Sequence, residues 1–349
     1  MKRFLSLDVF RGMTILAMIV LNNQTGKSVF APLVHSAGDG ITFADMIFPF
    51  FLFIAGAALW FSTHKHDYGI HSSRSKARQM LHIVRRTAVL FGLGILLNWF
   101  PFDSYFAFVR IPGVLQRIAL AYFFAALLTL YMPRMRAAAV TIIVLLAGYW
   151  FLLDSLGTEI VGRIDAAVFG SAHLYRPAFD PEGLLSTIPA IASVLIGYWA
   201  GRIMDRPNSV SGGIGSLMAI GLFLTGAGLL FGWVSPMNKP LWTSSYVLFT
   251  SGVAMIVWSI LSFVIEYMQA KKWCEFFAIG GTNSLFIYLL SVVLAKLFGL
   301  WGVTGAVYGF YQSYHVPDAV ASLMWAFTMV FVCWLIAWPL YRMRIFITA

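Results

Sequence analysis

The sequence predicts an all-α, polytopic membrane protein with about ten transmembrane helices and both termini in the cytoplasm. The chain has 349 residues, of which 60% are hydrophobic and 11% are charged, and its mean hydropathy is +0.81. Soluble domains carry about 25% charged residues. Apolar stretches of about 20 residues, the length that a helix needs to cross a bilayer, recur along the chain. This composition excludes a soluble enzyme, a disordered tail and a fibrous repeat.

Ten apolar stretches are expected to form the spans. They cover residues 8–25, 42–62, 79–99, 113–132, 137–154, 183–203, 213–232, 243–264, 275–298 and 319–340. The first is expected to stay as a signal anchor, because Asp8 and Arg11 interrupt it and no small-residue cleavage site follows. The two longest connections, 155–182 and 299–318, are expected to be loops on the outer side. Since the spans use most of the chain, residues 1–349 are expected to form a single transmembrane domain.

The orientation follows from the Lys and Arg residues. With a cytoplasmic N-terminus, sixteen of the 24 lie on the inner side, five lie outside and three fall within spans. The outer five are Lys27, Arg110, Arg163, Arg176 and Lys239, and the three within spans are Arg11, Arg117 and Lys296. The net charge of +10 therefore records membrane insertion, and no nucleic-acid partner is expected. Cys274 and Cys333 lie far apart and indicate neither a disulfide framework nor a metal site.

Polar residues within the first span are candidates for function, because such groups are costly in a bilayer. Asn22 follows Arg11 by eleven residues, which places both on one helical stripe about 16 Å long. The stripe would connect the inner surface with the outer half of the bundle. The alternative is a helix-packing face whose inner end is capped by a pair between Asp8 and Arg11.

A second candidate lies at the start of the second span. Thr42 is expected to cap that helix, and Asp45 at its third position would complement the positive helix N-terminus. His35 precedes this helix, and Gly38 and Gly40 would let the chain fold back toward the bundle. A histidine beside a carboxylate is the usual arrangement of an oriented general base. The alternative is a surface histidine and a carboxylate that only caps the helix.

Other intramembrane polar residues have simpler alternatives. Arg117, within Arg110-Ile-Pro-Gly-Val-Leu-Gln116-Arg117, must find an anion, a carboxylate or backbone carbonyls, and a structural ion pair would suffice. Snorkelling explains at least one of Arg85 and Arg86. Asn283 could serve only interhelical hydrogen bonding. The inner loop with His64, His66 and His71 is expected to be a solvated loop, and no metal is expected.

The acids are unevenly distributed. Nine of the fourteen Asp and Glu residues lie toward the outside. Acids contribute little to topology, so this excess suits a cationic outer ligand such as an amine. The inner basic residues suit a polyanion.

Several ordered blocks of sequence resemble the heparan-alpha-glucosaminide N-acetyltransferase family, and its bacterial NagX-like branch most. The blocks are Ser6-Leu-Asp8-Val-Phe10-Arg11-Gly12, His35 ahead of Thr42-Phe-Ala-Asp45-Met-Ile-Phe48-Pro49, Arg110 to Arg117, Asp180-Pro-Glu182-Gly, Ser235-Pro-Met-Asn238-Lys239-Pro-Leu-Trp242 and Gly281-Thr-Asn283-Ser-Leu. The resemblance implies ten or eleven helices and transfer of acetyl from cytoplasmic acetyl-CoA to a glucosamine amine on the far side. The sequence departs from the family pattern at Gly38 and Asp39, which leaves the acceptor open.

The resemblance also implies roles for individual residues. His35 corresponds to the active-site histidine, as base or nucleophile, with Asp45 as its orienting carboxylate and Asn22 as the amide that polarises the acetyl oxygen. The residues expected to bind the acyl donor acetyl-CoA are Arg11, Arg85, Arg86, Gln116, Arg117 and Asn283, and Asn283 could also polarise that oxygen. The residues expected to bind the amino sugar are Asp180, Glu182, Lys239 and Trp242.

The resemblance therefore implies a multi-pass acetyltransferase of the bacterial inner membrane, with the bilayer, acetyl-CoA and an amino-sugar acceptor as partners, and it suggests a homodimer. Two alternatives stay open at this point. One is a transporter of amino sugars or other solutes without chemistry, for which inverted repeats or interrupted helices would speak. The other is an O-acyltransferase that acts on a surface glycan.

Overall fold

The computed structural model describes residues 4–26, 28–64, 73–132, 135–205 and 210–347, and it confirms the all-α prediction. These residues form thirteen α-helices, and within them no strand occurs apart from an isolated bridge between Arg176 and Phe179. The expected loop histidines His66 and His71 lie outside the described residues.

Nine of these helices are long and apolar enough to cross a membrane. They are α1 (Leu5–Asn22), α2 (Phe43–His64), α3 (Ser73–Trp99), α4 (Val114–Tyr131), α5 (Met135–Leu156), α7 (Thr187–Met204), α8 (Val210–Phe231), α9 (Ser244–Ser262) and α13 (Asp318–Arg342). The span of α9 continues through a π-helical turn, η4 (Phe263–Tyr267). A bent pair, α10 (Cys274–Thr282) and α11 (Ser284–Leu300), makes a tenth, so the expected number of about ten is confirmed and the chain is a multi-pass membrane protein.

The expectation of one continuous helix over 275–298 is wrong. α10 and α11 meet at an angle of 80° because Asn283 between them leaves the helical conformation, with φ −119° and ψ 36°. Its side-chain amide donates to the carbonyl of Ile345 (3.0 Å) and accepts from the backbone N–H of Ile347 (2.8 Å). A segment beyond α13 thus satisfies polar groups at a helix break that would otherwise be costly within a bilayer.

The two long connections expected to be loops each contain a further helix. α6 (Glu159–Phe169) follows α5, and α12 (Val303–Ser313) follows α11. Both have eleven residues, too few to span a membrane, so a search for long apolar stretches passes over them. Short 3₁₀ turns add η1 (Ala31–Leu33), η2 (Phe106–Phe108) and η3 (Ser171–His173).

The chain divides into two compact units, which are described separately. Unit 1 consists mainly of Pro49–Ile260, with the short segment Gly38–Gly40. Unit 2 consists of Phe4–Ala37, Ile41–Phe48 and Leu261–Ala349. The expectation of a single domain over residues 1–349 stays a prediction.

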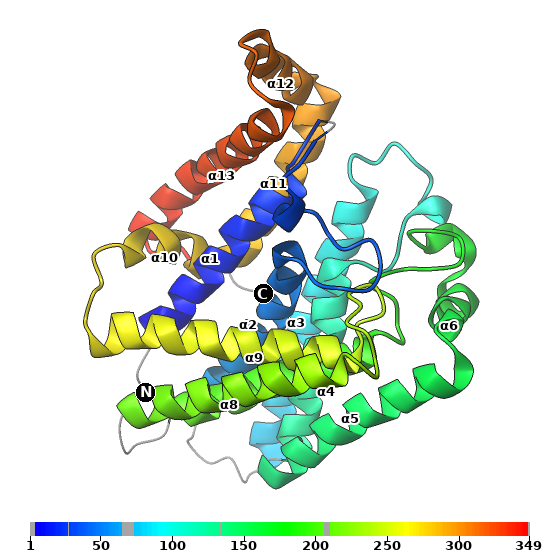
Figure 1. Cartoon of the computed structure of the whole chain (residues 1–349), viewed down its shortest axis with the longest axis vertical. Helices are drawn as coiled ribbons and strands as arrows, with labels where there is room; N and C mark the ends of the chain where they lie inside the picture. The colour runs from blue at the N-terminus through cyan, green and yellow to red at the C-terminus, as the bar shows by residue number, and fades with distance from the viewer. Residues whose placement is uncertain (1–3, 27, 65–72, 133–134, 206–209, 348–349) are drawn as a thin grey trace. The chain divides into compact units, whose positions relative to one another are not determined.

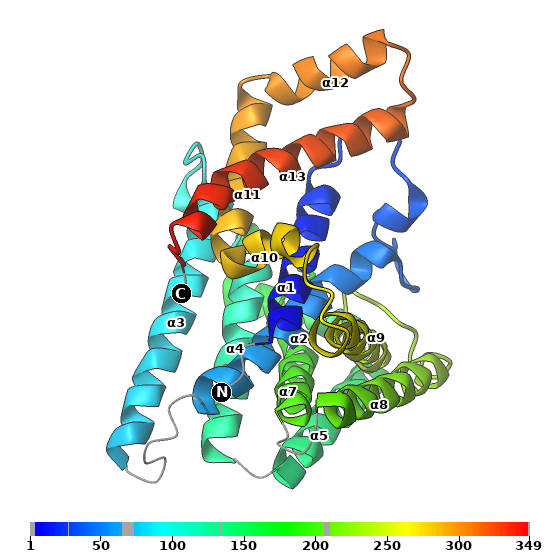
Figure 2. The same ribbon diagram turned by 90° about the vertical axis from the view of Figure 1, so that its left-hand side faces the viewer.

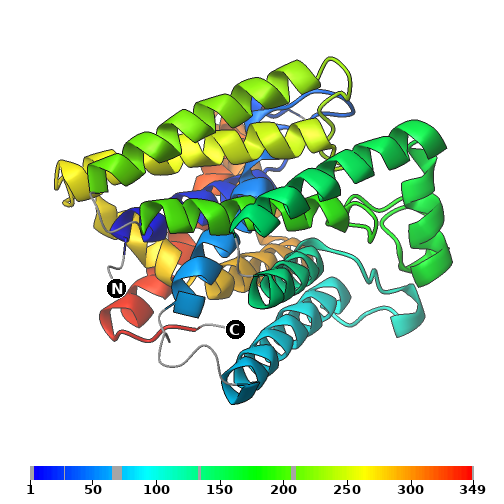
Figure 3. The ribbon, with the colours of Figure 1, turned by 90° about the horizontal axis from the view of Figure 1, so that it is seen from below.

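In unit 1, α7 is the central helix and is buried along almost its whole length. It packs against α4, α5 and α8, and α4 packs against α3. α8 and α9 run side by side (Figures 1 and 3). Glycines bring α2 and α7 together, since a Cβ at Gly56 would lie 1.9 Å from the carbonyl oxygen of Val194, and one at Gly197 would lie 2.0 Å from that of Phe53. Such close approach is the usual packing of membrane helices, which lack a hydrophobic drive to associate.

In unit 2, α1 packs against α10, α11 and α13 (Figure 2). The contact with α10 also depends on glycines: a Cβ at Gly12 would lie 1.8 Å from the carbonyl oxygen of Phe277, and one at Gly281 would lie 1.9 Å from that of Asp8. The neighbouring Gly280 has its nearest contact at 3.5 Å, an ordinary van der Waals distance. Only one of the two adjacent glycines is therefore required by the packing.

This difference supplies a matched pair of variants. Gly281→Ala is expected to lower the unfolding free energy by about 1–3 kcal/mol, because the methyl group forces α1 and α10 apart. Gly280→Ala should be neutral or slightly stabilising, since alanine is the better helix former. Thermal unfolding of both variants in the same detergent measures the effect. Equal midpoints for the two variants would contradict the packing described for α1 and α10.

Candidate active site

The predicted pair of His35 and Asp45 is present in unit 2. His35 Nδ1 lies 2.9 Å from Asp45 Oδ1, and the Asp45 side chain is wholly buried, whereas half of the His35 side chain is exposed. An ionised carboxylate only accepts hydrogen bonds, so beside ionised Asp45 the contact corresponds to the tautomer with the proton on Nδ1 and the lone pair on Nε2. The arrangement is that of an oriented base with an accessible ring.

The local sequence explains why Asp45 is held so firmly. It is the third residue of α2, and its Oδ2 accepts the backbone N–H of Thr42 (3.1 Å), which is half of a capping box. The same oxygen accepts the Thr42 hydroxyl (3.0 Å) and the backbone N–H of Ser36 (3.1 Å). The prediction that Asp45 complements this helix terminus is thus correct, and the same carboxylate also orients His35.

Of the other candidate residues in unit 2, Arg11 and Asn283 have contacts within the fold, whereas Asn22 is exposed. Arg11 Nη1 lies 3.4 Å from Asp8 Oδ1 and 3.5 Å from the carbonyl oxygen of Gly281, so the Asp8–Arg11 pair considered as an alternative does form. Asn22 is the last residue of α1 and is exposed. Asn283 is buried and uses its amide on the segment after α13. The roles of these residues toward acetyl-CoA stay predictions.

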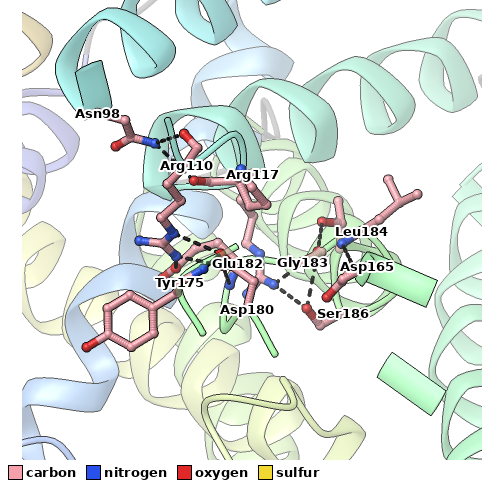
Figure 4. A network of polar contacts seen from close by, with 12 residues as sticks. Asn98, Arg110, Arg117, Asp165, Tyr175, Asp180, Glu182, Gly183, Leu184 and Ser186 are labelled. Atoms are coloured by element: carbon pink, nitrogen blue, oxygen red, sulfur yellow. Dashed lines mark hydrogen bonds and ion pairs between the residues drawn. The ribbon is translucent and has the colours of Figure 1, made fainter. Parts of the chain in front are cut away.

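In unit 1, Asp180 and Glu182 are bound by Arg110 (Figure 4). Arg110 Nε and Nη2 lie 2.8 and 2.6 Å from the two oxygens of Asp180, and Nη2 also donates to Glu182. Asp180 is wholly buried and accepts the backbone N–H groups of Tyr175 and Glu182 as well. Burial lowers the pKa of Arg110, but the hydrogen bonds and charges of Asp180 and Glu182 together outweigh burial. The pKa of Arg110 is therefore raised above its ordinary value.

Arg117 lies near the cluster of Arg110, Asp180 and Glu182 and is fully buried. Its Nη2 donates to the carbonyl of Gly183 (3.3 Å) and to the Ser186 hydroxyl, and its guanidinium carbon lies 4.8 Å from the centre of the Trp242 ring. The expected backbone carbonyl partner is therefore found. Within the described residues, its Nε and Nη1 have no hydrogen-bond partner.

Asp165 of α6 holds the opposite side of the same turn. Its Oδ1 accepts the backbone N–H of Leu184 (2.7 Å), and Gly183 packs so closely that a Cβ there would lie 1.8 Å from Oδ2. Burial raises the Asp165 pKa from 3.8 to about 6. The turn before α7 is thus fixed by an arginine of α4 and an acid of α6.

Trp242 and Lys239 occupy the connection between α8 and α9. Trp242 is buried and adopts a left-handed conformation (φ 56°), a strained state for a bulky residue that often marks functional sites. Its backbone N–H donates to the carbonyl of Lys239 (3.0 Å), whose side chain is half-buried. Tyr149 of α5 donates to the carbonyl of Leu241 (2.6 Å), which anchors the connection.

Gln116, Arg85 and Arg86 differ in burial. Gln116 is buried, and its side chain fills space left by Gly94 and Gly113. Arg85 is exposed, and Arg86 is half-buried with its guanidinium carbon 4.5 Å from the centre of the Tyr122 ring. Among the described residues, no three His, Cys, Asp or Glu side chains are grouped so that they could hold a metal ion.

The sequence placed Arg110 among the outer cations and at the start of the Arg110–Arg117 block, but it did not predict that Arg110 binds Asp180 and Glu182. The partners of Arg110 lie 70 and 72 residues further along the chain, so no local pattern joins them. The available signal was complementary charge: a basic motif before the fourth span and an acidic Asp-Pro-Glu motif before the sixth, both on the expected outer side. Asp165 and Ser186 gave no separate signal.

Comparison with known proteins identifies one family. The family described as heparan-alpha-glucosaminide N-acetyltransferase, catalytic, matches residues 3–235, which include His35, Asp45, Arg110 and Asp180. The heparan-alpha-glucosaminide N-acetyltransferases of Mus musculus and Homo sapiens are 26% and 27% identical to the chain over 99% of its length. The chain spans 60% and 59% of the length of these two relatives.

The raised pKa of Asp165 gives a pH-dependent prediction. The folded state binds this proton more tightly than the unfolded state, so ionisation costs stability as the pH rises from about 4 to about 6, by roughly 3 kcal/mol in total. Asp165→Asn keeps the acceptor for Leu184 and removes the charge. We expect its unfolding midpoint to exceed that of the wild type at pH 7 and to converge with it near pH 4. A difference that is independent of pH would contradict a buried, titrating Asp165.

Proposed function

This chain belongs to the heparan-alpha-glucosaminide N-acetyltransferase catalytic family, and from that premise we propose that it is a transmembrane acetyltransferase. Its acyl donor is acetyl-CoA on the cytoplasmic side of a bacterial inner membrane. Its acceptor is the amine of a glucosamine-type sugar on the periplasmic side. Both termini are cytoplasmic, and the chain acts as a homodimer.

The observation that carries this proposal is the contact of 2.9 Å between half-exposed His35 and buried Asp45. A thioester is already activated, so the protein needs chiefly a base and a donor for the developing oxyanion. The amine nitrogen attacks the acetyl carbonyl carbon, His35 Nε2 takes the amine proton, and the carbon–sulfur bond breaks to release CoA as thiolate. In the alternative order, Nε2 itself attacks first and carries the acetyl group. In both, Asp45 holds the tautomer and stabilises the imidazolium.

Buried polar atoms support the binding of acetyl-CoA to the predicted residues. Gln116 Nε2 and Arg117 Nε and Nη1 are buried donors without a partner among the described residues. Leaving such donors unsatisfied is costly, so they suit the carbonyl oxygens of the pantetheine arm. Exposed Arg85 and half-buried Arg86 suit its phosphates, as does Arg11. Asn22 and Asn283 keep their proposed roles at the acetyl oxygen.

The residues proposed to bind the acceptor sugar differ in how exposed their side chains are. Asp180 is wholly buried, whereas Arg110 and Glu182 are partly exposed. We therefore assign contact with the sugar hydroxyls to Arg110 and Glu182, and the positioning of Arg110 to Asp180. Lys239 and Trp242 complete the proposed set, with Trp242 in its strained conformation above Arg117.

One observation favours the transporter as the second candidate. The break between α10 and α11 is an interrupted span, a feature of many secondary transporters. Purified protein in sealed vesicles separates the two functions. An acetyltransferase releases CoA thiol from acetyl-CoA when the amino sugar is present, whereas a transporter accumulates labelled sugar without release of CoA.

Variants of His35 and Asp45 test the proposed catalytic pair. His35→Ala is expected to abolish acetyl transfer, and Asp45→Asn to reduce kcat about 10²- to 10⁴-fold through loss of the tautomer. Exposed His82 on α3 provides the control, and His82→Ala should retain full turnover. Release of CoA thiol by detergent-purified protein measures all three. Normal turnover in folded His35→Ala would refute the assignment of this residue.

The second prediction concerns the donor. Arg11→Ala is expected to raise the KM for acetyl-CoA by about tenfold, the effect of one lost charge-assisted contact, and to leave the KM for the sugar nearly unchanged. Arg163→Ala is the matched control, because Arg163 is exposed and its ion pair is with exposed Glu159. An increase confined to the KM of the sugar would reverse the proposed orientation of the substrates.

A further inference from the structure

Exposed apolar side chains flank His35 along the chain of unit 2. Val34 precedes it with 46% of its surface exposed, and Phe30 (41%) and Phe43 (43%) flank it along the chain. We group these three residues with three exposed aromatic residues of the α12 region under the name apolar collar: Phe30, Val34, Phe43, Trp301, Phe310 and Tyr314.

The collar lies where membrane-spanning helices of unit 2 end. α1 ends at Asn22 and α2 begins at Phe43, so the connection with His35 joins two spans at one membrane surface. α11 ends at Leu300 and α13 begins at Asp318, and α12 lies across their ends (Figure 2). Since spanning helices end near the boundary between hydrocarbon and headgroups, both connections lie at that boundary.

Two contacts show that these connections share one end of unit 2. The backbone N–H of Thr25 donates to the Ser322 hydroxyl at the start of α13 (3.0 Å). Gly26 packs against the Tyr308 ring of α12, where an added Cβ would lie 2.1 Å from the phenol oxygen. Gln24 then donates to the carbonyl of Leu33, two residues before His35 (3.3 Å).

The composition of α12 fits the membrane interface. The helix contains no Lys, Arg, Asp or Glu, and it presents Phe310 with 58% of its surface exposed. Trp301 before the helix (66%) and Tyr314 after it (69%) are also exposed. Tryptophan and tyrosine are enriched at the headgroup level of membranes, where one end of the ring is apolar and the other is hydrated. The collar is thus a surface suited to lipid headgroups and upper acyl chains.

From this placement we infer that the acceptor is an amphiphile: an amino sugar carried on a lipid or alkyl chain, whose apolar part lies against the collar while its amine reaches His35. The inference rests on the proposed acetyltransferase function and narrows its substrate class. A sugar on a membrane anchor is confined to the depth at which His35 lies.

The test compares two acceptors with the same sugar and amine, n-octyl and methyl β-glucosaminide, with the full chain in lipid nanodiscs. Burying only about two methylene groups is worth about tenfold, so kcat/KM for the octyl glycoside should exceed that for the methyl glycoside by at least about tenfold. Val34→Ser and Phe43→Ser are expected to lower this ratio. Phe124→Ser removes an exposed apolar side chain of α4 outside the collar and should leave it unchanged.

The possible outcomes separate this inference from the function on which it rests. Absence of acetyl transfer to both glycosides would refute the acetyltransferase. Transfer with equal kcat/KM for the two glycosides would refute only the amphiphilic acceptor. A high ratio that the collar variants and Phe124→Ser leave equally unaffected would show partition into the bilayer alone, and would overturn the role of the collar. If one collar variant does not fold, the ratio measured with the other variant decides the role of the collar.

Discussion

The carboxylate of Asp45 accepts four hydrogen bonds, from the His35 ring, the backbone of Ser36 and both the backbone and the hydroxyl of Thr42. A buried charge of this kind is tolerated only when its donors are built into the fold. These four donors come from one short connection, so the bonds that satisfy the charge also determine the course of that connection. The same four bonds fix the start of α2 and the direction of the histidine.

In unit 1, buried carboxylates also hold connections between helices, but their partners lie farther away in the sequence. Asp180 joins the segment before α4 with the segment before α7 through Arg110, and Asp165 joins α6 to the turn that Arg117 holds from the other side. Breaking a buried ion pair by removing one partner is strongly destabilising, typically by about 3–5 kcal/mol, because the other charge stays unpaired. The connections before α4 and α7 are therefore held by the ion pairs of Arg110 with Asp180 and Glu182, whereas α2 and α7 are held by close contacts between glycines and backbone.

Hydropathy predicted the spans well because membrane insertion depends on local composition, which a window of about 20 residues reports directly. His35 and Asp45 were predicted as a pair because they are only ten residues apart and the helix start lies between them. α6 and α12 were missed because each has only eleven residues, too few for the apolar window that reports a span. The break at Asn283 and the contacts of Arg110 depend on partners more than 60 residues away, which no local pattern of the sequence joins.

The two hydrogen bonds of the Asn283 side chain with Ile345 and Ile347 have a consequence for membrane assembly. These partners are synthesised 62 and 64 residues after Asn283, behind the whole of α13. While α10 and α11 enter the bilayer, the amide at their junction must find temporary donors and acceptors, such as water or the insertion machinery. The bend of this span is thus completed late in biogenesis, and the order in which helices leave the translocon becomes a requirement for the geometry of α10 and α11.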